Sequence, residues 1–375
     1  MKTILNIIKK EFLQFKRDPK MFMIILVAPV IQLIFLGYAA NLDVEKIHIA
    51  VLDRDNSAIS REYIQTLENT GYIFADYNVE KYKDGIELLK SGKVIGVIII
   101  PNNFEKKIKR YETADIQALF DASDGNTTTI SAGYIQQATS AFSKKILLDV
   151  MSKSGQQLSF GSINSKTRVW YNPELKSYVF MVPAIVGLLL MIITMLLTSL
   201  AIVKEKEIGT LEQLVVTPIK PHQLIIGKLI PYTIMGMVAV IIILSAMHYI
   251  FLIPIRGNIF FLLFASFIYI LSTLGLGLFV STISKTQQQA MMVAIFIFML
   301  PMIYFSGFAF PIENMPMIIQ KFTIVIPLKY FLTIIRGVIL KGLGFAELWE
   351  EILTLFLMGA AILFLSSKRF SKKLD

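Results

Sequence analysis

Long apolar runs alternate with polar segments along this chain. Six of the runs reach about 20 residues or more with almost no charge, and they cover residues 21–40, 178–203, 229–253, 259–283, 290–310 and 348–367. A helix of that length, rising about 1.5 Å per residue, crosses the roughly 30 Å hydrocarbon core of a bilayer. The pattern therefore predicts a polytopic α-helical membrane protein with six transmembrane helices.

One long polar stretch, residues 41–177, separates the first run from the second. Within it, strands are expected near 47–52, 72–79, 94–100 and 116–120, and helices near 57–69, 81–90 and 126–151. The continuous apolar run Gly96–Ile100 is typical of a strand covered on both faces. The stretch therefore predicts an inserted α/β domain with a mostly parallel sheet, followed by a Ser-, Gly- and Gln-rich linker at 152–166.

Basic residues indicate which side of the membrane each segment faces. They gather in the leader, 1–20, and in the tail, 368–373, so the positive-inside rule places both termini in the cytoplasm. Residues 322–340 could form a seventh span, but that would move the basic tail outside. We therefore expect interfacial or re-entrant helices in an outer region, 311–347. The same topology makes the α/β domain extracytoplasmic and the loop 204–223 cytoplasmic.

Composition adds to this interpretation. The chain is 55% hydrophobic, and its mean hydropathy is +0.63. It has no cysteine, which excludes disulfides, cysteine-based zinc sites and thiol nucleophiles, and its three histidines are too scattered to predict a metal site. Residues 41–177 hold 17 basic and 17 acidic residues, so the net charge of +10 belongs to the membrane part. That charge favours contact with anionic lipids over nucleic-acid binding, because no aromatic-interleaved basic patch accompanies it.

The sequence offers little chemistry of its own. Asp53, Asp55, Asp121 and Asp124 follow predicted strands, where they are expected to cap helices and make turns. No nucleophile elbow or HExxH motif is present, so we predict no catalytic, cofactor-binding or metal-binding residue. The phosphate-binding pattern GxxxxGK[ST] is also missing, and the spans carry almost no ionisable residue at mid-depth. Any uphill transport would then draw its energy from a partner.

The polar segment between the second and third spans is the candidate for meeting that partner. Its apolar residues Ile208, Leu211, Leu214 and Val215 are spaced to form one stripe of a helix, and Pro218 ends the segment. The spacing predicts a short amphipathic helix on the cytoplasmic face. Such a helix could transmit a push from a soluble protein or simply cap the bundle, and periodicity does not separate these two roles.

Four regions of the chain resemble ABC-2 type transporter permeases. The signature segment of that family is similar to Lys204-Glu205-Lys206-Glu207-x-Gly209-Thr210-x-Glu212-x-Leu214-x-x-Thr217-Pro218, followed by Gly227-Lys228-x-x-Pro231. Its interfacial first helix resembles the leader with Lys10-Glu11-Phe12 and Arg17-Asp18-Pro19, and its outer re-entrant region resembles residues 305–316 and 326–337. Lysines stand at 204 and 206 where the family often has arginine, which keeps the charge but loses bidentate pairing.

The resemblance implies the membrane subunit of an ABC exporter in the inner membrane, moving an amphipathic drug, a lipid or an ion outward. ATP and Mg²⁺ would bind a separate ATPase subunit, and a second permease would complete a homodimer or heterodimer among membrane lipids, with a periplasmic adaptor as a further partner. The ATPase-coupling residues would be Glu205, Glu207, Gly209, Thr210, Glu212, Thr217 and Pro218, with the acids docking the partner and Gly209 acting as a joint. The outer re-entrant residues would be Gly307, Pro311, Glu313, Pro327 and Arg336.

Two other classes of function stay open on the residues alone. A membrane-anchored sensor would capture a ligand with the isolated segment 41–177 and would need no ATPase. A gradient-driven carrier would lose transport when proton or sodium gradients collapse.

Overall fold

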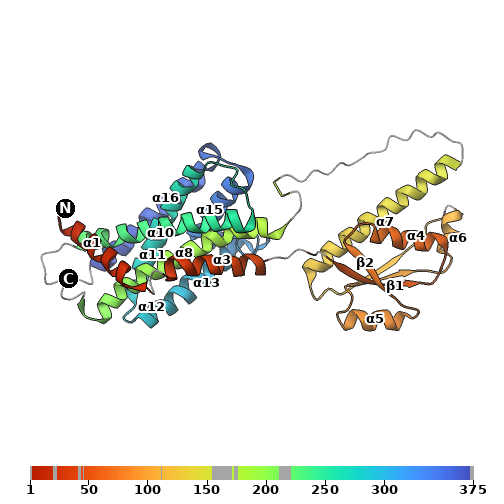
Figure 1. Cartoon of the computed structure of the whole chain (residues 1–375), viewed down its shortest axis with the longest axis horizontal. Coiled ribbons are helices and arrows are strands. Elements are labelled where there is room, and N and C mark those ends of the chain that lie inside the picture. Colours follow the sequence, from red (N-terminus) through yellow and green to blue (C-terminus); the bar gives the residue numbers. More distant parts are fainter. Residues whose placement is uncertain are drawn as a thin grey trace. The chain divides into compact units, whose positions relative to one another are not determined.

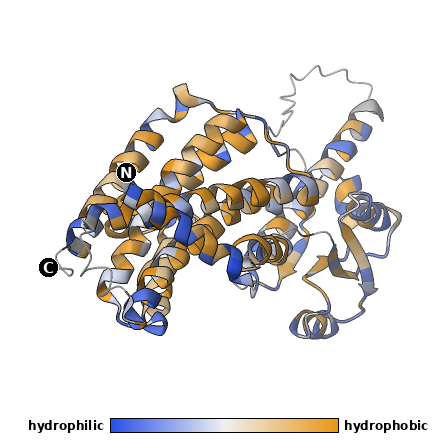
Figure 2. Ribbon diagram, turned by 60° about the vertical axis from the view of Figure 1, so that its left-hand side comes forward, coloured by the Kyte–Doolittle hydropathy of each residue, from blue (hydrophilic) through white to orange (hydrophobic). Residues whose placement is uncertain are grey.

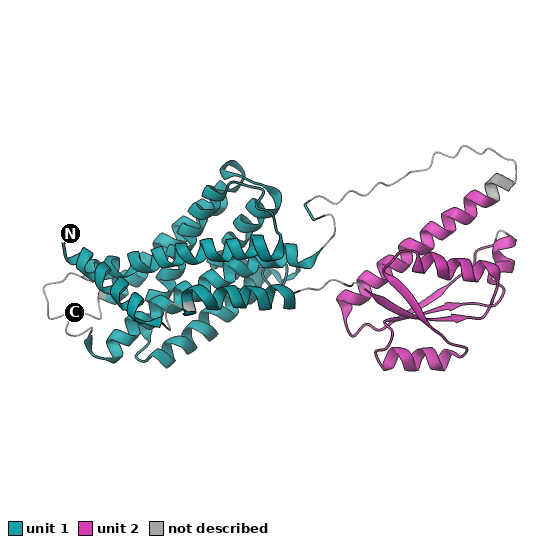
Figure 3. Ribbon diagram, in the orientation of Figure 1, with its two compact units in different colours: residues 1–41, 168–375 teal, residues 42–167 magenta. Residues whose placement is uncertain are grey.

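The structure is a computed structural model that describes residues 2–19, 23–40, 44, 46–110, 112–153, 171–172, 176–210 and 221–371. It divides into two compact units, shown in Figure 3. We call Met1–Asn41 with Arg168–Asp375 the membrane unit, and Leu42–Thr167 the α/β unit. The expected linker, 152–166, lies outside the described residues from position 154 onward.

The membrane unit consists of helices (Figure 1). It begins with α1 (Lys2–Arg17), a π-helical segment η1 (Met23–Val27) and α3 (Ala28–Ala39). After the α/β unit come α8 (Ser177–Glu207), α10 (Pro221–Phe251), α11 (Ile259–Ile283), α12 (Gln287–Val293), η2 (Ala294–Met299) and α13 (Leu300–Phe305). The chain ends with η3 (Ile312–Asn314), α14 (Met317–Phe322), η4 (Thr323–Val325), α15 (Pro327–Arg336), η5 (Gly337–Lys341) and α16 (Phe345–Ser371). Figure 2 shows hydrophobic colouring along most of these long helices.

Five helices of the described part are long and apolar enough to span a membrane, so the protein is a multi-pass membrane protein. A sixth candidate is the pair Met317–Val325 and Pro327–Lys341, which bends by 85° at Ile326. The first expected span corresponds to a shorter apolar helix, Ile25–Ala39, so a count of six transmembrane helices stays a prediction.

Several expected bounds differ from the observed ones because the ends of an apolar run do not coincide with the ends of the helix. The second span was expected to end at 203, but α8 continues to Glu207, since lysine and glutamate are good helix formers. The fifth was expected to reach 310, yet the helix stops at Phe305, and Gly307 then adopts a φ of +81°. The last helix begins at Phe345, three residues before its apolar run, with a kink at Leu348.

Helix α8 forms the centre of the membrane unit and packs against α3, α10, α11 and α15. Its contact with α11 is close at Gly277, where an added Cβ would lie 2.5 Å from the carbonyl oxygen of Met195. Most hydroxyls in the spans bond to their own helix; Thr194 Oγ1, for example, donates to the Leu190 carbonyl at 2.6 Å and meets Thr273 Oγ1 at 2.6 Å. The interior of the bundle is therefore packed with apolar side chains and with hydroxyls that mostly bond to their own helix, although Ser272 Oγ is buried without a hydrogen-bond partner among the described residues.

The α/β unit has a four-stranded sheet in the order β2-β1-β3-β4. The strands are β1 (Ile47–Asp53), β2 (Ile73–Asn78), β3 (Gly96–Ile100) and β4 (Gln117–Phe120). Both neighbours of β1 run parallel to it, and β4 runs antiparallel to β3, which confirms the mostly parallel sheet. The helices are α4 (Ala58–Glu68), α5 (Tyr82–Lys90), α6 (Phe104–Lys109) and α7 (Gly125–Lys153).

Strand β3 is buried on both faces, as its continuous apolar sequence predicts. Ile98 and Ile100 join a core under α4, α6 and α7, while Val97 and Ile99 join a second core under α5. Helices thus cover both faces of the sheet (Figure 1). The unit has a hydrophobic core of its own.

The four aspartates singled out in the sequence make turns and caps. Asp53 accepts backbone N–H bonds from the turn before α4, Asp121 accepts from Ser123 and Asp124 from Thr127. Asp55 reaches further and accepts the backbone N–H groups of Phe104 and Glu105 at 3.0 and 2.9 Å, at the start of α6. Each carboxylate therefore has a structural role.

Candidate functional site

A carboxylate lies on the buried face of the first helix. In α1, Ile7 and Glu11 are one turn apart, and both are buried, with 8% and 5% of their surface exposed. The helix lies against α10 so closely that a Cβ at Gly227 would come within 2.8 Å of the Ile7 side chain. A charged group in such a place is costly unless it is paired, so Glu11 points to partners on a neighbouring helix.

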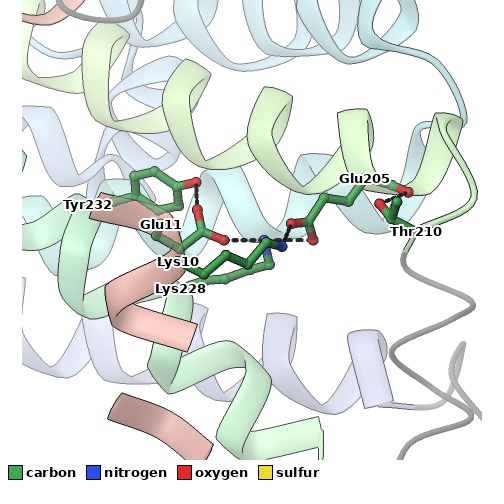
Figure 4. Close-up of polar contacts among 6 residues, drawn as sticks. All are labelled: Lys10, Glu11, Glu205, Thr210, Lys228 and Tyr232. Atoms are coloured by element: carbon green, nitrogen blue, oxygen red, sulfur yellow. Dashed lines mark hydrogen bonds and ion pairs between the residues drawn. The ribbon is translucent and has the colours of Figure 1, made fainter. Parts of the chain in front are cut away.

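Those partners come from α10, and Figure 4 shows that a second carboxylate, Glu205 of α8, joins the same group. Lys228 Nζ lies 2.9 Å from Glu11 Oε1 and 2.7 Å from Glu205 Oε2. Tyr232, one turn further along α10, donates its hydroxyl to Glu11 Oε2 at 2.6 Å. Lys10 Nζ closes the set by donating to Glu205 Oε1 at 2.5 Å. The result is a continuous polar connection between α1, the last turn of α8 and the first half of α10.

We call Lys10, Glu11, Glu205 and Lys228, with the Tyr232 hydroxyl, the four-charge junction. Two cations face two anions, so the group is neutral, and Lys228 is only 2% exposed. Removing one member would leave an uncompensated charge in a poorly hydrated place, which typically costs several kcal/mol. The junction therefore fixes the positions of three helix segments relative to one another.

The last turn of α8 also contacts the connection between α11 and α12. Glu207 Oε2 accepts hydrogen bonds from the backbone N–H and the side-chain amide of Gln287, both at 3.1 Å. Lys206 Nζ donates to the Ser284 carbonyl at 2.9 Å. The end of α8 thus joins both the four-charge junction and a second interhelical connection.

Of the expected coupling residues, the structure describes Glu205, Glu207, Gly209 and Thr210; Glu212, Thr217 and Pro218 lie outside the described residues. Glu205 and Glu207 lie on the spanning helix, not on a separate amphipathic helix. Only 8% of Glu205 is exposed, and its carboxylate is bound by Lys10 and Lys228, while its expected role in docking a partner stays a prediction.

Gly209 follows the end of α8 with a φ of +78°, a left-handed conformation that favours glycine and stops the helix. Thr210 folds back, and its hydroxyl donates to the carbonyl of Glu205 at 3.1 Å. The two residues together shape a turn at the end of α8, and the expected role of Gly209 as a joint stays a prediction. This turn lies immediately beside the four-charge junction, because Thr210 is bonded to Glu205.

The structure brings together two of the expected outer residues, Gly307 and Arg336. The guanidinium of Arg336 lies 3.7 Å from the Phe180 ring centre, and its Nη1 donates to the Gly307 carbonyl at 3.2 Å. Arg336 therefore links α15 with the start of α8 and the end of α13. Pro327 is the first residue of α15, whereas Pro311 and Glu313 are exposed and do not join the cluster.

Comparison of the chain with known proteins identifies its family. Residues 19–368 match the family described as "ABC-2 family transporter protein". This chain belongs to the ABC-2 transporter family. As an ABC-2 permease it is 34% identical to the probable multidrug ABC transporter permease YbhS of Escherichia coli, over 95% of this chain and 93% of that protein. It is 30% identical to the probable multidrug ABC transporter permease YbhR, over 95% and 94%.

A more distant relative is longer than this ABC-2 permease. ABC transporter G family member 20 of Dictyostelium discoideum is 26% identical over 98% of this chain but only 51% of its own length. The whole of this chain therefore corresponds to about half of that protein.

Sequence reasoning found part of the junction. Lys10, Glu11 and Lys228 belong to the segments that resemble the family, but the pattern gave them no role, and Tyr232 was missed. One signal was available: Glu11 interrupts the apolar stripe of α1, where a charge requires a buried partner. The identity of that partner, 217 positions away, could not be read from spacing.

Proposed function

We propose that this ABC-2 permease is the membrane subunit of an exporter that moves an amphipathic substrate outward with ATP hydrolysed by a separate subunit. The observation that carries the proposal is the four-charge junction, which connects the turn at Gly209 and Thr210 to α1, α8 and α10. Membership of the family and the relatives named as multidrug permeases support the same function. The sensor and gradient-driven alternatives have no comparable support.

In the proposed mechanism, the ATPase subunit binds near the segment between α8 and α10. A push on that segment moves the last turn of α8, because Thr210 is bonded to the Glu205 carbonyl. The two lysines bound to Glu205 then transmit the displacement to α1 and α10. Three helix segments shift together because separating them would leave buried charges unpaired.

The same proposal assigns sides of the membrane. Both termini and the junction lie in the cytoplasm of an inner-membrane protein, and the α/β unit and the cluster around Arg336 lie outside. A second permease, identical or related, completes the complex, and a periplasmic adaptor is a candidate partner of the α/β unit. Positive charge at the ends of the membrane unit supports this orientation.

Affinity purification of the full-length chain from its own host tests the partner. We expect a P-loop ATPase to co-purify and the reconstituted complex to move ethidium in proteoliposomes only when ATP is supplied. Purification of the chain without any ATPase, or ethidium transport that follows a proton gradient without ATP, would contradict the proposal.

Coupling is tested by Glu205→Gln, which removes the charge and keeps the shape. We expect the ATPase to remain bound and active while ethidium transport per ATP falls at least tenfold, since the two lysines lose their common anion. Glu313→Gln, an equal change at an exposed outer position, is the matched control and should leave the ratio unchanged. An unchanged ratio in Glu205→Gln would remove the junction from the mechanism.

A further inference from the structure

A cavity of about 670 Å³ opens beside the four-charge junction. Three helices line it with side chains at helical spacing. Lys10, Gln14 and Arg17 come from successive turns of α1, Lys204 and Ile208 from the end of α8, and Met235 from α10. The cavity therefore lies between one face of each helix and has the junction as its wall.

Some of the charged side chains around the cavity form ion pairs with described residues, and others do not. Within the junction, Lys10 is bound to Glu205, so this part of the wall is neutral. Arg17 and Lys204 are exposed on the rim, and neither has an ion-pair partner among the described residues. Outside the junction, Asp18 is the other charged residue in the wall of the cavity, so Arg17, Lys204 and Asp18 together give this part of the wall a net charge of +1.

Part of the remaining wall is apolar, beside the polar side chains of Gln14 and Thr210. Phe15, Ala201 and Met235 line the cavity, and Ile208 on its rim is 65% exposed. A site with two cations and one carboxylate at its edge, and with a partly apolar wall, suits a ligand with an anionic head and a hydrocarbon tail. Basic pockets between helices at the cytoplasmic side of membrane proteins bind phospholipid head groups for this reason.

We propose that this cavity binds one anionic phospholipid, whose phosphate is held by Arg17 and Lys204 and whose first acyl carbons lie against Phe15 and Met235. A lipid bound there touches α1, α8 and α10 together and so stabilises the arrangement that the junction also holds. The assignment to the inner leaflet rests on the proposed orientation, whereas the binding itself requires neither the ATPase nor transport.

Titration of the purified, delipidated full-length chain tests the site. Dioctanoyl phosphatidylglycerol is the anionic probe, dioctanoyl phosphatidylcholine the neutral one, and glycerol 3-phosphate the head group without chains. We expect phosphatidylglycerol to bind at least tenfold more tightly than either of the others. Equal binding of phosphatidylcholine would overturn the charge assignment, and equal binding of glycerol 3-phosphate would show a simple phosphate site and overturn the lipid assignment.

Variants connect this binding to the cavity. Arg17→Gln with Lys204→Gln should weaken phosphatidylglycerol about tenfold or more, because each basic residue near a head group contributes of the order of a fivefold gain. The matched control, Lys2→Gln with Lys368→Gln, removes the same charge from exposed positions outside the cavity and should leave binding unchanged. Equal loss in both double variants would indicate general charge attraction and overturn the site.

Filling the cavity gives an independent test. Ala201→Phe places a ring in its wall without changing charge, and we expect phosphatidylglycerol binding to fall while the protein still elutes as a folded species. A folded Ala201→Phe protein with unchanged binding would overturn the proposal. If that variant does not fold, the charge variants above decide the question alone. Failure here leaves the proposed exporter function standing, because ATPase co-purification is measured separately.

Discussion

Lys228 is the residue on which the four-charge junction depends. Its ammonium group is 2% exposed and lies within 2.9 Å of both Glu11 and Glu205. Lys10 also binds Glu205, but its side chain is 41% exposed and water can replace part of that contact. Burial makes Lys228 the member whose loss the surrounding structure tolerates least.

We predict that Lys228→Met lowers the free energy of unfolding by about 3 to 5 kcal/mol, since it leaves the buried carboxylate of Glu11 without a counter-charge. Unfolding in SDS, followed by circular dichroism, measures the change. Lys368→Met removes a lysine from an exposed position in α16 and should change the free energy by less than about 0.5 kcal/mol. Equal stability of Lys228→Met and the parent would mean that the junction adds no stability.

Asp55 provides a pH-dependent prediction in the α/β unit. Partial burial raises its pKa, but hydrogen bonds from the backbone of Glu105, from Ser57 and from the backbone of Phe104 outweigh this, so the pKa is lowered from its ordinary 3.8. A carboxylate with a lowered folded pKa stabilises the fold above its unfolded pKa and loses that contribution as pH falls through the folded value. The contribution should therefore be complete at neutral pH and should decrease progressively as the pH falls below about 4.

The comparison is between the fragment 42–167 and its Asp55→Asn variant. We expect the variant to be less stable at pH 7 in urea unfolding, with the difference shrinking as the pH is lowered from 4 towards 2. Asp115→Asn, which removes the same charge from an exposed loop, serves as the control. A difference that stayed constant over this pH range would show that the charge of Asp55 is unimportant.

At the scale of elements, the contact between α8 and α11 is set by glycine. A methyl group at Gly277 would lie 2.5 Å from the Met195 carbonyl oxygen and 2.9 Å from Thr198 Cβ. Both neighbours belong to α8, and the carbonyl is backbone, so neither can move aside as a flexible side chain could. The two helices would have to separate.

Gly277→Ala should therefore destabilise the membrane unit by about 1 to 3 kcal/mol, the usual range for overpacking. Thermal unfolding of the purified protein in detergent is a suitable measurement. Gly344→Ala is the control, because the nearest atom to its added methyl is a Glu347 carboxylate oxygen at 3.4 Å. A Tm for Gly277→Ala no lower than that of the control would contradict the close packing.

The elements differed in how well the sequence predicted them. Residues 259–283 were predicted to the residue, since Asn258 caps α11 and the apolar run fills the helix. The end of α8 was placed four residues early, because the charged turn Lys204–Glu207 is polar and still helical. The strand positions followed from local pattern, but the order β2-β1-β3-β4 is a tertiary property. The ion pairs of the four-charge junction could not be predicted, because they join residues that are far apart in the sequence.

For the whole molecule, the main prediction concerns sides of the membrane. The chain has no cysteine, so any cysteine introduced gives a label without background. Glu68 is exposed in α4 of the α/β unit, and Lys368 is exposed in α16 of the membrane unit. These two positions should face opposite aqueous compartments under the proposed orientation.

We expect an impermeant maleimide to label Glu68→Cys in spheroplasts, because the proposed orientation puts the α/β unit outside. Lys368→Cys should react only after the membrane is opened. Labelling is read as a mass shift of the purified protein. The reverse pattern would invert the topology and with it the assignment of the four-charge junction to the cytoplasm.

The distance in sequence between Glu11 and Lys228 has a consequence for biosynthesis. The two residues are 217 positions apart, so the ribosome must complete α8, the α/β unit and the start of α10 before Glu11 meets its cation. At about 5 to 20 residues per second, this interval lasts roughly 10 to 40 s. Throughout that time the Glu11 carboxylate has no Lys228 to pair with. Because burying an unpaired charge is costly, α1 stays in contact with water at the membrane surface. Docking of the first helix is thus one of the late steps in the assembly of this protein.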